Sequence, residues 1–233
     1  MRVKLFGTKL YELLEIKPGV TALIGGGGKT TLLYHLAGEL YQRGTVAIVT
    51  TTHIKKPAQY PFAATEAEAK RMLAERGYVC IGTEVEDGKL TAPDFAGWEQ
   101  IADYVLVEAD GAKMHPLKAH APHEPVIPAL CENVICVVGA SGFQTPIVQA
   151  VHRPEIFAAL AEVSEQSIAT PELVAKVLEK EHLHTRVFLN QVDSAQDKFR
   201  KSISKARVKD FAGGLSCPVV SGSLRQGIWQ KVK

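Results

Sequence analysis

The stretch that decides the fold reads Thr21-Ala22-Leu23-Ile24-Gly25-Gly26-Gly27-Gly28-Lys29-Thr30-Thr31. A short apolar run leads into four glycines, and Lys-Thr-Thr is followed by an apolar, helix-like segment. Glycines let the backbone curl so that several N–H groups face one anion, and the helix behind them adds the positive end of its dipole. The order strand, glycine loop, helix therefore predicts a phosphate-binding loop.

The loop departs from the usual motif at one position. G-x-x-x-x-G-K-[ST] requires its first glycine at position 23, where this chain has Leu23. The alternative is a flexible glycine linker followed by an unrelated lysine, but the strand and helix on either side favour the phosphate loop. In that loop Lys29 would contact the outer phosphates, and the Thr30 hydroxyl would bind Mg²⁺. The nucleotide-binding residues expected here are Gly25, Gly26, Gly27, Gly28, Lys29, Thr30 and Thr31.

Composition is typical of a globular protein with a sizeable core. The chain has 233 residues, of which 46% are hydrophobic and 22% charged, and its net charge of +2 does not indicate a broad nucleic-acid surface. The four cysteines form no C-x-x-C pair, which favours buried reduced thiols over a zinc or disulfide framework. The sequence shows neither a signal peptide nor an apolar run of about 18 residues. We therefore expect a cytoplasmic protein with no membrane and no nucleic-acid partner.

Strand-like and helix-like segments alternate along the chain. Nearly pure apolar strands indicate burial on both faces, so the expected fold is α/β and P-loop NTPase-like, with a mostly parallel sheet covered by helices on both faces. We expect a single P-loop nucleotide-binding domain over residues 1–233, with a small hairpin insertion near 78–92. The expected strands are 20–24, 45–50, 78–85 with 89–91 as a hairpin, 103–107, 134–138, 185–189 and 217–220. The expected helices are 29–43, 66–76, 155–162, 171–180 and 195–207.

Two acids follow the strand expected at 103–107. Ligands of such sheets bind beyond the carboxyl ends of the strands, so Glu108 and Asp110 should lie near the phosphate loop. Either could hold Mg²⁺ or a water of its shell, and with Lys29 they are the candidate catalytic residues. The alternative is an ordinary turn with solvated acids. The pattern does not choose between the two acids.

Thr50-Thr51-Thr52-His53 follows the strand expected at 45–50. We expect this strand to lie directly beside the phosphate-loop strand, so that the threonine hydroxyls could bind Mg²⁺ or position water. The preference of threonine for strands explains the run equally well.

A base-recognition site is indicated farther along the chain. Asn190-Gln191-Val192-Asp193 resembles the N-K-x-D motif of GTP-binding proteins, with Gln191 in place of the lysine. The Asp193 carboxylate would accept two guanine N–H groups, although a role as helix N-cap also explains this residue. Ser221 opens a Ser-Gly-Ser segment that resembles the loop covering guanine in the same proteins. Asn190, Asp193 and Ser221 are therefore the candidate base-side residues, and both GTP and ATP remain open.

A basic loop follows the two acids. Lys113 and Lys118, together with Arg153, could hold an anionic substrate or close over the phosphates. His115, His120 and His123 lie in the same stretch, but their spacing fits no standard metal cluster.

Motifs across the chain resemble one known family. The matching segments are Gly-Gly-Gly-Gly-Lys-Thr-Thr (25–31), Val-Glu-Ala-Asp-Gly-Ala-Lys (107–113), Pro-Leu-Lys-Ala (116–119), His-Glu-Pro-Val-Ile-Pro (123–128), Val-His-Arg-Pro-Glu (151–155) and Leu-Asn-Gln-Val-Asp (189–193). They resemble the YqeC-like proteins, which are described as accessory proteins for selenium-dependent molybdenum hydroxylases. His115 stands where that family commonly has arginine. The resemblance implies a role in maturing or delivering a selenium- or molybdenum-containing cofactor, with a molybdenum hydroxylase or another maturation factor as partner.

The glycine loop also resembles the K-G-G-x-G-K-T loop of a dimeric P-loop class that includes metallochaperone GTPases. A homodimer is therefore a candidate assembly, although Ile24 replaces the signature lysine of that class. Three functions remain open: a Mg²⁺-dependent GTPase or ATPase that acts as an accessory factor, a small-molecule kinase, and a nucleotide-gated binding module with little catalysis.

Overall fold

A computed structural model describes residues 8–52, 54–55, 60–85, 88–193 and 205–233. In these ranges the main sheet has nine strands in the order β14-β13-β12-β10-β1-β8-β2-β5-β4, and all neighbouring pairs are parallel except the edge pair β13–β14. The strands are β1 (Gly19–Gly25), β2 (Val46–Thr50), β4 (Phe62–Ala63), β5 (Tyr78–Ile81), β8 (Tyr104–Glu108), β10 (Cys131–Gly139), β12 (Arg186–Asn190), β13 (Val219–Ser223) and β14 (Ile228–Lys231).

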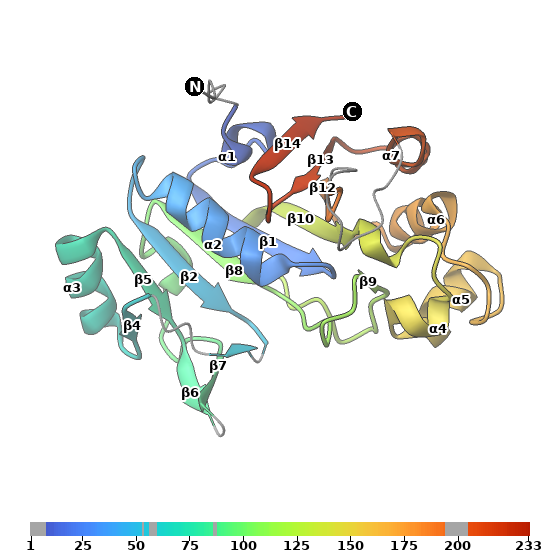
Figure 1. Ribbon diagram of the computed structural model, residues 1–233. Helices are drawn as coiled ribbons and strands as arrows, with labels where there is room; N and C mark the ends of the chain where they lie inside the picture. The colour runs from blue at the N-terminus through green and yellow to red at the C-terminus, as the bar shows by residue number, and fades with distance from the viewer. Residues whose placement is uncertain (1–7, 53, 56–59, 86–87, 194–204) are drawn as a thin grey trace.

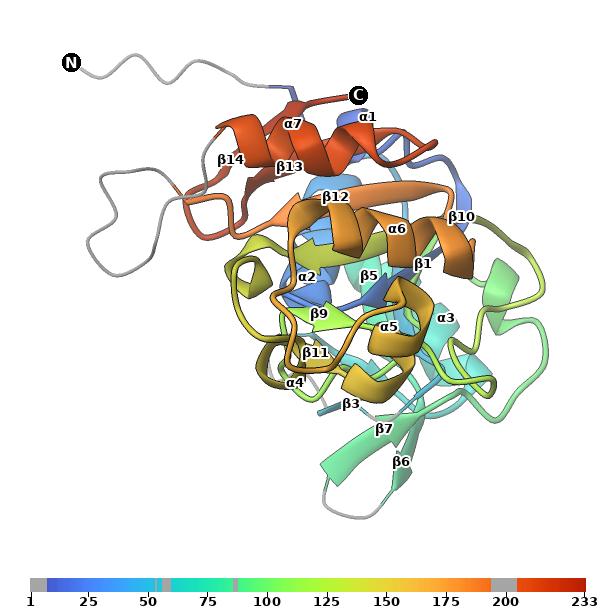
Figure 2. The same cartoon turned by 90° about the vertical axis from the view of Figure 1, so that its right-hand side faces the viewer.

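Helices cover both faces of this sheet (Figures 1 and 2). They are α1 (Leu10–Leu13), α2 (Lys29–Leu40), α3 (Glu66–Arg76), α4 (Ile147–Ala150), α5 (Pro154–Ala161), α6 (Pro171–Glu181) and α7 (Lys205–Gly213). Short 3₁₀ turns lie at Trp98–Gln100 and Ala140–Gly142. The expectation of a mostly parallel α/β sheet with helices on both faces is confirmed.

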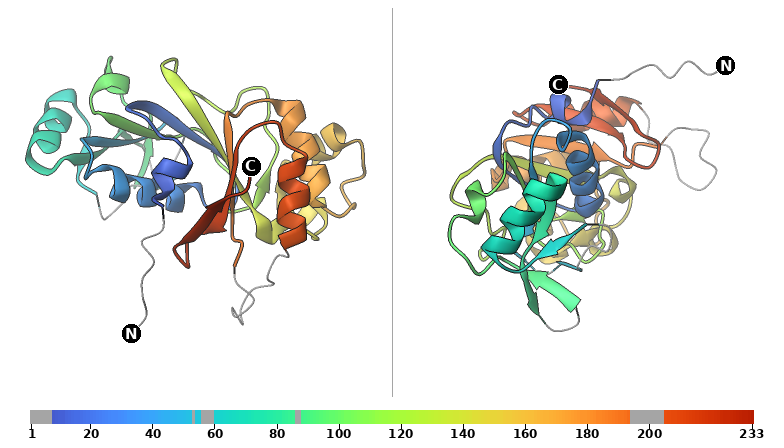
Figure 3. Two further views of the ribbon diagram at one scale, coloured as in Figure 1. Left: turned by 90° about the horizontal axis from the view of Figure 1, so that it is seen from above. Right: turned by 90° about the vertical axis from the view of Figure 1, so that its left-hand side faces the viewer.

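Side chains that point alternately to the two faces of the sheet form two hydrophobic cores. In β1, Ala22 and Ile24 face a core formed with α3 to α7, whereas Leu23 between them faces α1 and α2. Because successive strand residues point to opposite faces, each central strand must be apolar at nearly every position. The view from above separates α1 and α2 from the helices on the other side of the sheet (Figure 3, left).

Local signals define several helix ends. α3 begins with a capping box in which Thr65 accepts from the Glu68 amide and the Glu68 side chain accepts from the Thr65 amide, and it ends at Gly77 with φ 79°. α6 begins at Pro171, where the expected helix also begins, and the N-cap Thr170 accepts from the Leu173 amide.

Smaller strand pairs lie outside the main sheet. β6 (Thr83–Val85) pairs in antiparallel fashion with β7 (Lys89–Thr91), and β3 (Ile54–Lys55) pairs with β7. The strand expected at 78–85 is divided, because its first part forms β5 of the main sheet and only β6 pairs with β7. This three-stranded unit projects from the sheet below α3 (Figure 1; Figure 3, right). β9 (Leu117–Lys118) pairs in parallel with β11 (Val151–His152), which ties the loop after β8 to the start of α5.

Two further expectations require correction. β2 does not lie directly beside β1, because β8 is inserted between them and pairs with both. The helix expected at 195–207 lies outside the described residues up to 204, and the described helix α7 continues to Gly213, six residues beyond the predicted end. The apolar face of α7, formed by Val208, Phe211 and Ala212, packs in the core and carries the helix past that point.

Candidate functional site: a glycine loop with a buried charge network

The glycine loop connects β1 to α2 and needs glycine for two reasons. Gly25, Gly27 and Gly28 have φ values of 92°, 75° and 119°, a backbone region that other residues rarely adopt. A Cβ atom added to Gly27 would lie 2.3 Å from the Gly139 Cα, and one added to Gly28 would lie 2.7 Å from the Asn190 Nδ2. The loop is therefore fixed tightly against neighbouring strand ends and loops, unlike a flexible linker.

Backbone amides in the loop divide into two groups. Those of Gly25, Gly26 and Gly27 donate to Asp110 Oδ2 (2.8 Å), Val137 O (2.9 Å) and His115 O (3.1 Å). The amides of the first turn of α2 have no acceptor within the helix, and they point along the positive end of its dipole. The capacity to bind an anion therefore lies at the start of α2.

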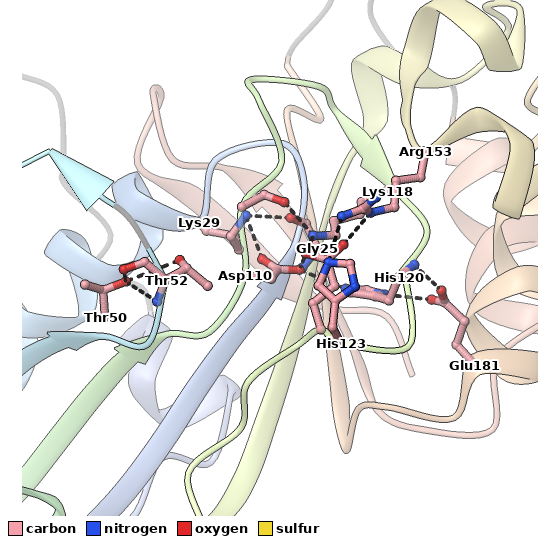
Figure 4. Close-up of polar contacts among 12 residues, drawn as sticks. Gly25, Lys29, Thr50, Thr52, Asp110, Lys118, His120, His123, Arg153 and Glu181 are labelled. Atoms are coloured by element: carbon pink, nitrogen blue, oxygen red, sulfur yellow. Dashed lines mark hydrogen bonds and ion pairs between the residues drawn. The ribbon is translucent and has the colours of Figure 1, made fainter. Parts of the chain in front are cut away.

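Lys29 is turned inward at the first position of α2. Its Nζ donates to Gly25 O at 2.6 Å and lies 2.9 Å from Asp110 Oδ1 (Figure 4). The residue is 5% exposed. In this arrangement the charge of Lys29 is neutralised within the protein.

Thr30 and Glu108 form the second polar contact of the loop. The Thr30 hydroxyl donates to Glu108 Oε2 at 2.8 Å, and Glu108 is the last residue of β8. Burial raises the pKa of the Glu108 carboxyl, against the opposing effects of Lys29 and Thr30. A hydroxyl and a carboxylate side by side are oxygen ligands of the kind that Mg²⁺ prefers, so this donor set fits the ion.

Asp110 lies at the centre of a separate, buried network. Its Oδ2 accepts from the Gly25 amide and lies 2.8 Å from His120 Nε2 and 3.3 Å from Lys118 Nζ. Burial alone would raise the pKa of this carboxyl, but the His120 hydrogen bond and the charges of Lys29 and Lys118 hold the pKa at about 2. Asp110 is therefore ionised and faces cations, whereas Glu108 faces Thr30.

A second layer of carboxylates fixes the cations around Asp110. Glu181, at the end of α6, accepts from the His120 amide at 2.6 Å and lies 3.0 Å from His120 Nδ1. Glu124 lies 2.7 Å from Lys118 Nζ and 2.5 Å from Arg153 Nε. The network thus extends from the glycine loop to α6 and to the start of α5 (Figure 4).

The residues of the predicted anion loop are placed differently from one another. Lys113 is exposed, the Lys118 side chain is completely buried between Asp110 and Glu124, and Arg153 is bound to Glu124. Lys113 presents its charge to solvent and the Arg153 side chain is partly exposed, whereas that of Lys118 is not, and an anion-binding role for the group stays a prediction. In the described residues, no three His, Cys, Asp or Glu side chains gather in a way that could hold a metal ion.

Thr50, Thr51 and Thr52 direct their hydroxyls into the protein. Thr50 Oγ1 donates to Glu108 O at 3.2 Å and accepts from the Thr52 amide at 3.0 Å, and Thr51 Oγ1 donates to Val126 O at 2.7 Å. Figure 4 shows Thr50 and Thr52 apart from the Asp110 network. His53 lies outside the described residues.

The base-side residues gather at the ends of β12 and β13. Asn190 Nδ2 donates to Gly27 O at 2.8 Å, and Gln191 Nε2 donates to the same oxygen at 3.3 Å. Asp193 Oδ1 accepts from Ser223 Oγ at 2.6 Å, whereas Ser221 lies two residues earlier within β13. The structure thus brings Asn190 to the glycine loop and shows Ser223 as a hydrogen-bond partner of Asp193, whose Oδ2 also lies 3.9 Å from Arg225 Nη2.

The sequence did not indicate the contacts that four residues of this site make. His120 was considered as a metal ligand and Ser223 only as part of the Ser-Gly-Ser segment, whereas Glu124 and Glu181 were given no individual role. Lys118 and His120 are two residues apart, which places both on one side of an extended segment, so their spacing offered a signal. Glu181 offered none, because only the tertiary packing of α6 brings it to His120.

A glycine loop between a central parallel strand and a helix, with a carboxylate at the end of the adjacent strand, defines an α/β protein of the P-loop NTPase type. The sequence model of a family described as YqeC protein matches residues 21–155. A curated relative, the uncharacterized protein YqeC of Escherichia coli (strain K12), is 32% identical over 181 residues, which cover 69% of this chain and 68% of the relative. The chain belongs to the YqeC family.

One solved structure with similarity is the signal recognition particle 54 kDa protein from Aeropyrum pernix K1 in complex with GDP. Its TM-score is 0.42 and its sequence identity 15%, over 94% of this chain and 48% of that chain. This chain therefore spans about half the length of that structure. Separately, none of the helices in the described ranges has the length and apolar content needed to cross a membrane.

Proposed function

We propose that this protein binds a nucleoside triphosphate with Mg²⁺ at the loop of residues 25–31 and hydrolyses it as an accessory factor in the maturation of a selenium- or molybdenum-containing hydroxylase cofactor. The observation that carries the nucleotide-binding part is the glycine loop at the end of a central parallel strand, which leads into the first turn of α2 with Thr30 and with Lys29, whose Nζ is retained by Asp110. Amides at a helix N-terminus, a lysine and a threonine hydroxyl are the groups that bind a polyphosphate and its Mg²⁺.

Each residue has a distinct part in this proposal. The α2 amides and Lys29 would bind the phosphates, and Thr30 and Glu108 would hold Mg²⁺, which when bound neutralises phosphate charge. Hydrolysis then needs mainly positioning and electrostatic stabilisation, and no covalent protein nucleophile. Asn190 and Asp193, beyond the loop, would face the base, with GTP and ATP both retained as candidates.

The accessory role rests on the family resemblance of the chain. The Val107–Lys113 segment that carries this resemblance contacts the glycine loop, because Glu108 accepts from the Thr30 hydroxyl and Asp110 accepts from the Gly25 amide. His115, which directly precedes the Pro116–Ala119 segment, accepts from the Gly27 amide through its carbonyl oxygen. A change at the phosphates would therefore reach the segment most characteristic of the family. This contact supports a nucleotide-dependent interaction with a partner maturation factor.

The test is thermal unfolding with ATP, GTP, ADP and GDP, each with Mg²⁺, on wild type and Lys29→Ala. A nucleotide at 100 times its Kd should add about 2.7 kcal/mol to the free energy of unfolding of the wild type, and much less to the variant. Release of inorganic phosphate would support hydrolysis, whereas transfer to an added acceptor without free phosphate would favour the kinase. Equal stabilisation of both proteins, or of neither, would contradict the proposal.

A further inference from the structure

Lys29 is unavailable to a nucleotide in the arrangement that the structure shows. A lysine that binds outer phosphates must direct its ammonium group toward the space in front of the loop. Here the Nζ is directed back to Gly25 O and Asp110 Oδ1, at 2.6 Å and 2.9 Å, and the side chain is 4% exposed. The phosphates would have to take this lysine away from Asp110.

Asp110 is built to remain in place when Lys29 leaves. Its other oxygen accepts from the Gly25 amide and contacts Lys118 and His120, so a carboxylate with no solvent exposure keeps hydrogen-bond partners and compensating charge. Lys118 is fixed in turn by Glu124, and His120 by Glu181. Removing one cation from a buried carboxylate strongly destabilises the protein unless other cations remain, and here Lys118 and His120 remain beside Asp110.

Asp110 is not positioned beside Thr30 as a magnesium ligand would be. The hydroxyl of Thr30 contacts Glu108, and both oxygens of Asp110 are engaged by nitrogen donors or cations. In a strand, residues two positions apart point to the same face. β8 ends at Glu108, so Asp110 lies outside the strand and need not point in the same direction as Glu108. The two acids therefore serve different parts of the loop.

We propose that Asp110 is a positioning residue that holds Lys29 retracted while the loop is empty, and that the phosphates of a bound nucleotide compete with Asp110 for this lysine. The proposal rests on the nucleotide binding proposed above and adds a self-inhibited empty state to it. Lys118 and His120 weaken the hold of Asp110 on Lys29, because they share its negative charge.

The test compares Asp110→Asn with wild type in titrations with ATP and GTP, once with Mg²⁺ and once with EDTA. Asparagine can still accept from the Gly25 amide but loses the charge that retains Lys29. The nucleotide Kd should fall by about tenfold in both conditions, as for loss of one charged contact. The empty variant should at the same time unfold at a lower temperature, because Lys29 and Lys118 lose their counter-charge. A merely structural role would lower affinity and stability together.

Glu108→Gln is the matched control, since Glu108 ends the same strand and faces Thr30. It should weaken binding with Mg²⁺ and leave binding in EDTA unchanged. If Asp110→Asn behaves like this control, Asp110 serves the metal and the proposal is wrong. An unchanged Kd for Asp110→Asn would also overturn it.

Lys118→Met provides a second variant with the opposite expected sign. Removing this cation should strengthen the hold of Asp110 on Lys29 and raise the Kd severalfold in EDTA, with no further effect in the Asp110→Asn background. If the Asp110→Asn variant does not fold, the single Lys118→Met variant still tests the proposal, because an unchanged nucleotide Kd in that variant would overturn it. If wild type binds neither nucleotide, the proposed function itself fails, an outcome distinct from all of these.

Discussion

The Nζ atom of Lys29 lies 2.9 Å from Oδ1 of Asp110, and both side chains are almost completely buried. The pair joins the first turn of α2 to the segment after β8, which are 81 residues apart in sequence. It places the cation of the phosphate loop in direct contact with a carboxylate that three further donors hold in position. The loop is thus an internally compensated arrangement, in which the charge of its lysine is balanced within the protein.

Stability at acid pH should depend on Asp110. Its pKa is lowered to about 2 in the folded protein, from an ordinary value of 3.8, so the unfolded chain binds more protons between these values. The contribution of Asp110 is therefore present above about pH 4 and is lost as the pH falls toward 2. Urea unfolding of wild type and Asp110→Asn should show a gap at pH 7 that narrows through this range. A constant gap down to pH 2 would contradict the assignment.

Gly27→Ala should destabilise the protein and abolish nucleotide binding. The φ of 75° is unfavourable for alanine by about 1–2 kcal/mol, and the new methyl group would lie 2.3 Å from the Gly139 Cα. Gly38→Ala is the matched control within α2, because Gly38 is exposed and nothing lies within 4 Å of an added Cβ. That change should stabilise the protein by about 0.5–1 kcal/mol. Thermal unfolding measures both, and equal effects would show that the loop does not require glycine.

Much of the fold could be predicted from the sequence because its signals are local. The apolar strands, the glycine loop, the start of α6 at Pro171 and the end of α3 at Arg76 all appear at or near the expected residues. The strand order could not be obtained in this way, since the insertion of β8 between β1 and β2 depends on pairing between distant segments. The two-residue strands β9 and β11 exist only through their mutual pairing and leave no periodic pattern.

The candidate site shows the same division between local and distant information. Because Glu108 and Asp110 follow a predicted strand, both acids were expected near the glycine loop. Their side chains contact different partners because β8 ends at Glu108, before Asp110. His120 contacts Asp110, and Glu181 of α6 contacts His120. These contacts depend on the tertiary packing of α6. Residue types therefore indicated a phosphate site, whereas the neutralised state of Lys29 required the tertiary structure.

Thr30→Val should remove the Mg²⁺-dependent part of nucleotide binding. Valine has nearly the shape of threonine but lacks the hydroxyl that lies 2.8 Å from Glu108 Oε2, so the metal would lose one oxygen ligand. Calorimetric titration with Mg²⁺ should show a Kd raised by about tenfold or more, while the Kd in EDTA stays near that of wild type. Weakening of similar size in both conditions would assign Thr30 to the phosphates instead of the metal.

Asp193→Asn should change the preferred base. Asp193 lies three residues after the end of β12, and Ser223 Oγ donates to its Oδ1 at 2.6 Å. A carboxylate in this position can accept the two N–H groups of guanine. Asparagine offers one donor and one acceptor, which suits xanthine, whose ring carries a carbonyl where guanine has an amino group. The Kd for GTP should rise by about tenfold or more, that for XTP should fall, and that for ATP should not change. Ser223→Ala, which leaves the carboxylate but removes its support, should weaken GTP binding less and give no gain for XTP. If Asp193→Asn alters none of the three affinities, Asp193 does not face the base, and its hydrogen bond with Ser223 serves only to join β12 to β13.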